Sequence, residues 1–358
     1  MESVVKHLHK ILGLGGLAAA LAWSPALSAP GGPDELLFVS NRSGNLFEIY
    51  RMAADGSAVQ RLLPERGEAG EMSWSPDGSR ALFTRSLPGR GQNIYSVSLQ
   101  DGRVRQLTND LLPNAEPSWS PDGQRIAFVS SRDGSRRLYI MDADGGNPRR
   151  VTDSTEEDET APRFSPDGKR LAYLANKPAH GLRVAVAEIS SQRWQVVSDN
   201  KERSHETQPV WSPDGSRLLF SVIKSQIAQL VVMAADGSAR QQLTSGEARH
   251  VAGQWSPDGR QILYLATPGN AARQSLRLMA ADGSGARSLL PPDSDVMSAQ
   301  WSADGRRIFF VEQTATGGKI FSIDTEGQGL RRLSGNEGFD LNPLVCCTRL
   351  AARLASTH

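Results

Sequence analysis

Short apolar runs alternate with polar turn residues along almost the whole chain. Runs such as Leu36-Leu37-Phe38-Val39 and Leu138-Tyr139-Ile140-Met141 are bounded by Gly, Pro, Asp or Ser, and they are too short for typical helices. The glycines and prolines are spread through the chain instead of gathering in one tail. This pattern predicts many short β-strands joined by tight turns, and therefore an all-β fold.

One tetrapeptide, Ser-Pro-Asp-Gly, recurs along the chain. In this tetrapeptide Pro presets φ, Asp can bond the local backbone and Gly accepts a positive φ, so each copy predicts a hairpin turn. Its serines, including that of the variant Ser302-Ala303-Asp304-Gly305, are spaced by 45, 45, 47, 44 and 46 residues and lie at Ser75, Ser120, Ser165, Ser212, Ser256 and Ser302. A repeat of this length is typical of a four-stranded propeller blade.

Aromatic residues recur on both sides of this turn. One precedes the Ser and another follows the Gly by five residues, at Trp74, Trp119, Phe164, Trp211, Trp255 and Trp301, and at Phe83, Phe128, Tyr173, Phe220, Tyr264 and Phe310. We expect them to pack between blades. A third strand then runs into an Asp-Gly turn such as Asp144-Gly145, and a fourth short strand ends in sequences such as Gln106-Leu107-Thr108. Each unit thus has strands A to D, with Ser-Pro-Asp-Gly between A and B and Asp-Gly between C and D.

The two ends of the repeat region complement each other. The region begins at residues 36–40 with a B-like strand that no A strand precedes, and it ends at Asp340–Val345, which resembles the A strand at Asn114–Trp119. We therefore expect six whole blades and one blade split between the ends. The prediction is an all-β, seven-bladed propeller over residues 36–345 with split-blade ring closure, and six blades is the alternative count.

The N-terminal residues have the form of a secretory leader. Lys6 and Lys10 precede the apolar run of residues 11–22, and small residues lead to Ala29. We assign residues 1–28 to a signal peptide, 29–35 to a linker and 346–358 to a C-terminal tail. We expect an exported, periplasmic protein with no transmembrane segment in the mature chain. Cys346 and Cys347 are adjacent, so free thiols, a vicinal disulfide and an intermolecular bridge all remain open.

The Ser-Pro-Asp-Gly turns, the Asp-Gly turns and the ending Gly-x-x-Arg-x-Leu-Thr resemble the repeats of the TolB family, a branch of the WD-like propellers. The resemblance covers residues 36–345. TolB is understood to carry an α/β domain before a six-bladed propeller. Here only residues 29–35 lie between the expected leader and the first strand, so we expect a propeller that stands alone. The resemblance implies a scaffold for partner proteins of the cell envelope, peripheral to a membrane complex.

Net charge and mean hydropathy argue against two classes of protein. The chain has 40 Lys and Arg against 39 Asp and Glu, and removing Lys6, Lys10 and Glu2 with the leader leaves 38 of each. A neutral chain gives no electrostatic case for binding nucleic acid. A mean hydropathy of -0.39 with one strongly apolar run excludes a polytopic membrane protein.

Antiparallel strands place the A-B and C-D turns on one face of the ring and the B-C and D-A loops on the other. The second face receives all the irregular segments, where recognition usually lies on a rigid scaffold. Residues leading into strand A are expected to project there toward the central channel, next to Glu156-Glu157-Asp158. The candidate binding residues are Glu71, Glu116, Glu159, Glu206, His205, His250 and Asp340. They predict an acidic channel mouth for a cation or a basic segment of a partner, and a solvated polar rim is the alternative.

The sequence offers little for catalysis. It has no Gly-x-Ser-x-Gly, and His205-Glu206 lacks the second His of a zincin helix. We therefore expect no catalytic residue, no metal and no cofactor, and a non-catalytic scaffold that mediates protein-protein interaction. The alternative is a propeller-type enzyme, a polysaccharide lyase or hydrolase, with a His/carboxylate metal site drawn from His180, His205 and His250.

Overall fold

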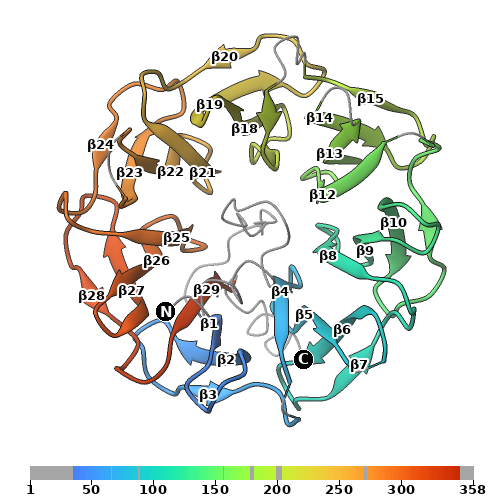
Figure 1. The fold of residues 1–358 in the computed structure, drawn as a ribbon, viewed down its shortest axis with the longest axis horizontal. Helices are drawn as coiled ribbons and strands as arrows, with labels where there is room; N and C mark the ends of the chain where they lie inside the picture. Colours follow the sequence, from blue (N-terminus) through green and yellow to red (C-terminus); the bar gives the residue numbers. More distant parts are fainter. Residues whose placement is uncertain are drawn as a thin grey trace, which may run out of the picture.

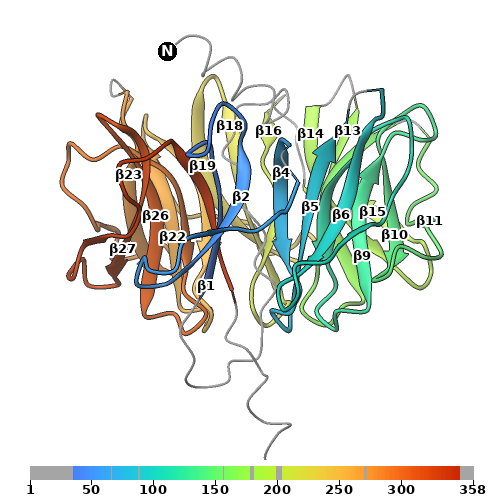
Figure 2. The same cartoon turned by 90° about the horizontal axis from the view of Figure 1, so that it is seen from below.

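A computed structural model describes residues 35–346, apart from residues 66, 88, 156, 178–180, 199–203 and 270–271. The expected leader, most of the linker, His180, Glu156 and Cys347 lie outside the described residues. In the described part every regular element is a β-strand, and the strands form a ring of blades around a central axis (Figure 1). Figure 2 shows the strands running between the two faces of this ring. The predicted all-β propeller is confirmed.

The described strands divide into seven blades. Blade 1 contains β29 (Asp340–Val345), β1 (Glu35–Ser40), β2 (Glu48–Ala53) and β3 (Gln60–Arg61). Blade 2 contains β4 (Ala69–Trp74), β5 (Arg80–Ser86), β6 (Gln92–Ser98) and β7 (Val104–Gln106). Blade 3 contains β8 (Asn114–Trp119), β9 (Arg125–Ser130), β10 (Arg137–Asp142) and β11 (Arg149–Arg150). Blade 4 contains β12 (Asp158–Phe164), β13 (Arg170–Lys177), β14 (Gly181–Glu188) and β15 (Trp194–Val196).

In blade 5 the innermost strand is broken into two pieces that both pair with the second strand. The blade contains β16 (His205–Glu206), β17 (Val210–Trp211), β18 (Arg217–Lys224), β19 (Ile227–Ala234) and β20 (Gln241–Gln242). Blade 6 contains β21 (Arg249–Trp255), β22 (Gln261–Thr267), β23 (Ser275–Ala280) and β24 (Arg287–Ser288). Blade 7 contains β25 (Val296–Trp301), β26 (Arg307–Thr314), β27 (Gly317–Asp324) and β28 (Arg331–Arg332). Blades 5 and 6 share a single parallel residue pair, Ala228 with Arg249.

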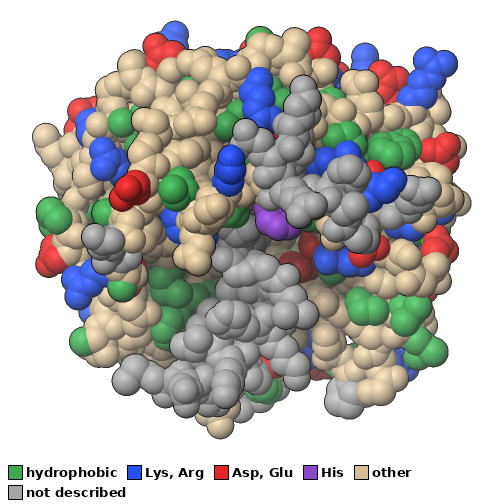
Figure 3. Space-filling model, turned by 45° about the horizontal axis from the view of Figure 1, so that its top comes forward, with side chains coloured by type: hydrophobic (Ala, Val, Ile, Leu, Met, Phe, Trp, Pro, Cys, Tyr) green, Lys and Arg blue, Asp and Glu red, His purple; other side chains and the backbone are tan. Residues whose placement is uncertain are grey.

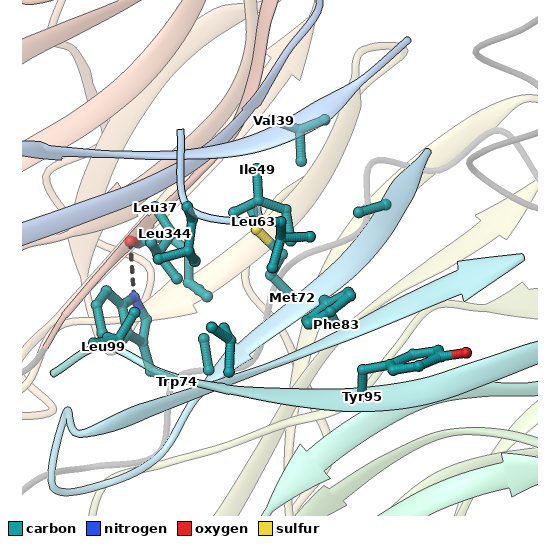
Figure 4. Close-up of a cluster of buried hydrophobic side chains, with 14 of the residues drawn as sticks. Leu37, Val39, Ile49, Leu63, Met72, Trp74, Phe83, Tyr95, Leu99 and Leu344 are labelled. Atoms are coloured by element: carbon teal, nitrogen blue, oxygen red, sulfur yellow. Dashed lines mark hydrogen bonds between the residues drawn. The ribbon is translucent and has the colours of Figure 1, made fainter. Parts of the chain in front are cut away.

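The blade split between the chain ends is present. β29 pairs antiparallel with β1, so that Leu36 faces Val345 and Ser40 faces Asp340. Side chains of blades 1 and 2 then pack together, among them Leu37, Met72 and Phe83 (Figure 4). The indole Nε1 of Trp74 donates to the carbonyl oxygen of Leu344 at 3.0 Å. Trp74 therefore binds the neighbouring blade through its polar edge as well as through its apolar surface, and Trp211 and Trp255 do the same through Nε1 bonds to the carbonyl oxygens of Arg163 and Val210.

The Ser-Pro-Asp-Gly turns owe their shape to local hydrogen bonds. Ser75 Oγ donates to Asp77 Oδ1 at 2.5 Å and accepts from the Arg80 N–H at 2.9 Å, while Asp77 Oδ1 accepts from the Ser79 N–H at 3.0 Å. Burial opposes ionisation of Asp77, but these hydrogen bonds outweigh it and lower the pKa of the carboxyl. The Asp residues of this motif are thus turn residues, as the repetition predicted.

The same turns also join successive blades. Arg170, at the start of β13, stacks over the Trp211 ring of the next blade at 4.7 Å and donates to the Gly215 carbonyl oxygen at 3.0 Å. Pro166 lies so close to Gly215 that an added Cβ would be 3.3 Å from its Cδ. Arg80, Arg125 and Arg217 stack in the same way on Trp119, Phe164 and Trp255. A motif that reads as a local turn therefore also makes the contact between blades.

The Asp-Gly turns make a second contact between blades. Gly237 has φ 88°, and a Cβ there would overlap the carbonyl oxygen of Val197, at the end of the preceding blade's last strand. Gly56, Gly145 and Gly283 face Leu333, Leu107 and Leu243 in the same manner, and Gly327, in the corresponding Glu-Gly turn of blade 7, faces Leu289. The glycine is required both by its dihedral angle and by the close approach of the next backbone.

We predict that Arg170→Ala lowers the free energy of unfolding by about 1–2 kcal/mol, because it removes a cation–π contact and a charge-assisted hydrogen bond between blades. Urea denaturation measures the change. The matched control is Arg306→Ala, whose guanidinium is 85% exposed and lies 3.9 Å from its own turn's Asp304, and it should change stability by less than about 0.5 kcal/mol. Equal effects of the two substitutions would show that the contact between blades contributes nothing.

Candidate functional site

The candidate acidic residues occupy two different positions of strand A. Glu71 and Glu116 stand three residues before the recurrent Trp, whereas Glu159, Glu206, His250 and Asp340 stand five residues before it or its equivalent. A β-bulge separates the two positions, since the register shifts between Gly70 and Ser73 in blade 2 and between Ala115 and Ser118 in blade 3. The bulge changes which way side chains point, so the two sets face different surroundings.

Glu71 and Glu116 form a ladder along the innermost strands. Both have a positive φ, 31° and 55°, as does Ala161 with 56°. Glu71 Oε2 accepts from the Glu116 N–H at 2.6 Å, and Glu116 Oε2 accepts from the Ala161 N–H. Glu116 Oε1 also pairs with Arg136 Nη2 at 2.8 Å. Each carboxylate therefore binds the bulged backbone of the next blade, and the ladder ends at Ala161 because alanine has no carboxylate to continue it.

The ladder has unusual electrostatics. Withdrawal from water and the neighbouring charge of Glu116 raise the pKa of Glu71 to about 7. Arg163, two residues beyond Ala161, faces both carboxylates, and burial lowers its pKa while they raise it. The Arg163 Nη2 also donates to Gln208 Oε1 at 3.3 Å. The sector of the ring from blade 2 to blade 4 thus brings opposite charges together, and sequence reasoning found the acids but missed Arg163.

Glu159 and Glu206 do not project toward the channel mouth, contrary to the prediction. Their exposed fractions are 1% and 0%. Glu159 accepts from the Leu138 N–H at 2.9 Å and from Thr152 Oγ1 at 2.5 Å, both in blade 3. Glu206 accepts from the Val184 N–H at 2.7 Å and from Ser198 Oγ, both in blade 4. Burial raises the pKa of both carboxyls, and their role is to tie one blade to the preceding one.

Asp340 is also internal, with 0% exposure, and it belongs to the ring closure. Its Oδ1 lies 2.8 Å from Arg42 Nη2, in the loop that follows β1. Nearby, the fully buried Lys319 donates to the carbonyl oxygens of Asn336, Glu337 and Gly338. Burial lowers the pKa of Lys319, and Asp340 acts in the opposite direction. Asp340 is therefore buried against the loops that close the ring.

The two described candidate histidines differ in exposure. His205 is exposed at the start of β16. His250 is half-buried, its Nδ1 lies 3.1 Å from Gln229 Oε1, and burial together with Arg277 lowers its pKa. Glu157 is buried and pairs with Arg183 at 2.5 Å. Within the described residues, no group of three or more His, Cys, Asp or Glu is arranged to hold a metal ion.

The face of the molecule seen in Figure 3 carries both signs of charge. Lys and Arg side chains are interspersed there with Asp and Glu. The ion pair of Glu116 with Arg136, whose side chains are 20% and 47% exposed, follows the same pattern. In the part of the chain that the structure describes, no helix is long and apolar enough to cross a membrane.

The comparisons with known proteins agree with this geometry. The family model of the TolB β-propeller domain matches residues 65–199 and 137–345, well over half of the chain. Among solved structures, TolB from Acinetobacter baumannii is 17% identical with a TM-score of 0.56, covering 87% of this chain and 82% of that one. No curated protein sequence is significantly similar to the chain.

Enzymes of known structure share the fold as well. An oligogalacturonate lyase in complex with manganese is 14% identical with a TM-score of 0.64, covering 85% of this chain and 86% of that one. A puromycin-hydrolyzing peptidase from Mycobacterium tuberculosis is 17% identical with a TM-score of 0.69, covering 91% of this chain but only 56% of that one. At such identities these likenesses show the fold alone.

We predict that Glu71→Gln stabilises the protein only where Glu71 is ionised. The raised pKa of about 7, against an ordinary 4.5, means that the folded protein binds more protons than the unfolded chain between these two pH values. Stability therefore falls as pH rises through this window, and glutamine, which still accepts from the Glu116 N–H, removes the loss. The gain should grow from near zero at pH 4.5 to about 3 kcal/mol above pH 7, as measured by urea denaturation.

The control is Glu65→Gln, since the Glu65 side chain is 83% exposed and its substitution should have no such pH dependence. A gain for Glu71→Gln that stays constant across the window would contradict the buried ladder.

Proposed function

The chain belongs to the TolB β-propeller domain family, and from that premise we propose that it is an exported, non-catalytic scaffold that binds partner proteins in the periplasm. The supporting observation is that the two faces of the ring differ: one is built from recurring turns, and the other from loops that vary between blades. On the face of the Ser-Pro-Asp-Gly and Asp-Gly turns, which we call the regular face, the recurring residues contact the next blade. The face of the B-C and D-A loops, which we call the irregular face, carries the differences between blades.

Export is supported by the leader-like sequence that precedes the propeller. Lys6, Lys10 and the apolar run of residues 11–22 have the order of a secretory signal. Cys346 is buried directly after β29, and its N–H donates to the Glu35 carbonyl oxygen.

The proposed binding residues are those candidates whose side chains are not fully buried. Glu71 and Glu116 lie on the ladder, His205 is exposed and His250 is half-buried. Opposite charges at Arg136 and Arg163 accompany the carboxylates. We propose that this surface receives a polar, mixed-charge segment of a partner, instead of the purely basic segment that an acidic mouth would favour.

The proposal is tested by chemical crosslinking in the native host, followed by mass spectrometry. The variant Glu116→Gln with His205→Ala removes a charge and an exposed imidazole from the irregular face, while glutamine keeps an acceptor for the Ala161 N–H. We expect it to lose most of the crosslinked partners, because those side chains contribute to recognition.

The matched control is Lys169→Ala with Arg306→Ala, two exposed residues of the regular face. It should leave the partners unchanged. The proposal fails if the control variant loses the partners and the irregular-face variant keeps them.

A metal-dependent lyase is the alternative, which the shared fold of the manganese-bound oligogalacturonate lyase raises. That alternative predicts manganese that survives dialysis and is lost on His205→Ala, together with a rise in unsaturated-sugar absorbance on oligogalacturonate. We expect less than one-tenth equivalent of metal per chain by plasma mass spectrometry and no absorbance change. Stoichiometric metal that depends on His205 would replace the scaffold proposal with the lyase.

A further inference from the structure

The loop between β7 and β8 presents two leucines to solvent on the irregular face. The exposed fractions are 81% for Leu111 and 46% for Leu112, and Leu111 is the most exposed large apolar residue of the described chain. The corresponding loops elsewhere have polar tips, such as Asp153-Ser154-Thr155 before blade 4 and Ser245-Gly246-Glu247 before blade 6. The repeat itself therefore does not require leucine at this place.

A buried asparagine holds this loop through hydrogen bonds. Asn93 is 1% exposed, and its Nδ2 donates to the carbonyl oxygens of Gly91 at 2.9 Å and Asp110 at 3.0 Å. Its Oδ1 accepts from Thr108 Oγ1 at 2.9 Å and from the Asp110 N–H at 3.0 Å. Both ends of the Asn93 amide are thus used to hold the loop in one conformation.

A second buried amide and an arginine, both in blade 3, also form hydrogen bonds with the loop. Asn114 is 0% exposed, and its Nδ2 donates to Asp110 Oδ2 at 2.9 Å and to the Leu112 carbonyl oxygen at 3.3 Å. Arg132 Nη2 donates to the same Asp110 Oδ2 at 2.9 Å. The backbone at the leucine tip is therefore fixed directly, and not only at its ends.

Gly91 completes the support. A Cβ at residue 91 would overlap the carbonyl oxygen of Leu111 and lie 2.7 Å from its carbonyl carbon. Only glycine allows the loop after β5 to lie against the leucine tip this closely. The tip is thus a rigid apolar projection, and a rigid projection loses little conformational freedom when it binds.

We propose that Leu111 and Leu112 form an apolar anchor that inserts into an apolar pocket of a partner protein. This inference rests on the proposed function and names the place on the irregular face where the partner is held. A leucine that stays in water contributes nothing to folding, whereas one that enters a desolvated pocket contributes strongly to binding.

The charges around the tip favour a protein over a membrane or a second copy of the chain. Arg90, Asp110 and Arg132 bring both signs, and Asp110 pairs with Arg132, so no basic cluster is present to hold an anionic lipid surface. Two leucines are also too small an area for stable anchoring in a bilayer. Among the described residues, the other exposed large apolar residues of this face, Leu46 and Ile227, are single side chains on blades 1 and 5, so they offer a second copy little apolar area to bind.

Site-specific photo-crosslinking in the native host tests the anchor. A photoreactive amino acid replaces the exposed Asn109, which leaves both leucines intact, and a second probe at Ser225 reports on another loop of the irregular face. We expect a discrete adduct from position 109 that mass spectrometry identifies as one partner protein. It should disappear in Leu111→Ser with Leu112→Ser and persist in the matched control Leu330→Ser, which alters an exposed leucine on blade 7.

The purified partner identified in this way should bind the double variant at least tenfold more weakly than wild type, while the urea midpoint of the variant stays unchanged. Adducts from Ser225 alone would overturn the anchor but keep the scaffold proposal, and adducts from neither probe would overturn both. An adduct with the chain itself would overturn the inference. So would leucine-dependent flotation with vesicles of phosphatidylethanolamine and phosphatidylglycerol.

Discussion

The structure depends on the pairing of its last strand with its first. β29 and β1 complete blade 1, and without that pairing the ring would expose two strand edges. Side chains reinforce the closure: Arg42 pairs with Asp340 at 2.8 Å, and Asn41 Oδ1 accepts from the Phe339 N–H at 2.6 Å. The buried ammonium of Lys319 donates hydrogen bonds to carbonyl oxygens of the loop that leads into β29. Closure makes every blade a neighbour of two others, which is the condition for the repeated contacts that follow.

Those contacts explain why one face of the ring is uniform. In four blades, an arginine two residues after the Ser-Pro-Asp-Gly turn stacks on an aromatic residue of the next blade. Most of the Asp-Gly turns lie close to the backbone of the preceding blade. A residue that must fit its neighbour has little freedom to change. The irregular face is released from this constraint, and the loop around Leu111 lies on it, while the ladder from Glu71 through Glu116 lies on the innermost strands. Variable loops on a rigid ring of blades are the arrangement expected of a binding scaffold.

The sequence predicts this fold well because its turns are encoded locally. Ser75, Asp77 and Gly78 make their hydrogen bonds within six residues, so the motif carries its own structure wherever it occurs. The candidate site was harder to predict, because a β-bulge in strand A separates Glu116 from Glu159 in orientation and nothing in the sequence marks the bulge. The buried position of Lys319 and the joint action of Asn93 and Asn114, which are 21 residues apart, arise only from the packed loops.

Ring closure through β29 and β1 should make the split blade as stable as an interior blade. Amide hydrogen–deuterium exchange of the mature chain, followed peptide by peptide, compares residues 340–345 with β13 in blade 4. A closed ring predicts that both segments are protected to a similar degree and open in the same cooperative step as denaturant is added. Rapid exchange of residues 340–345 while β13 stays protected would show that β29 is a frayed edge. That result would contradict the closed ring.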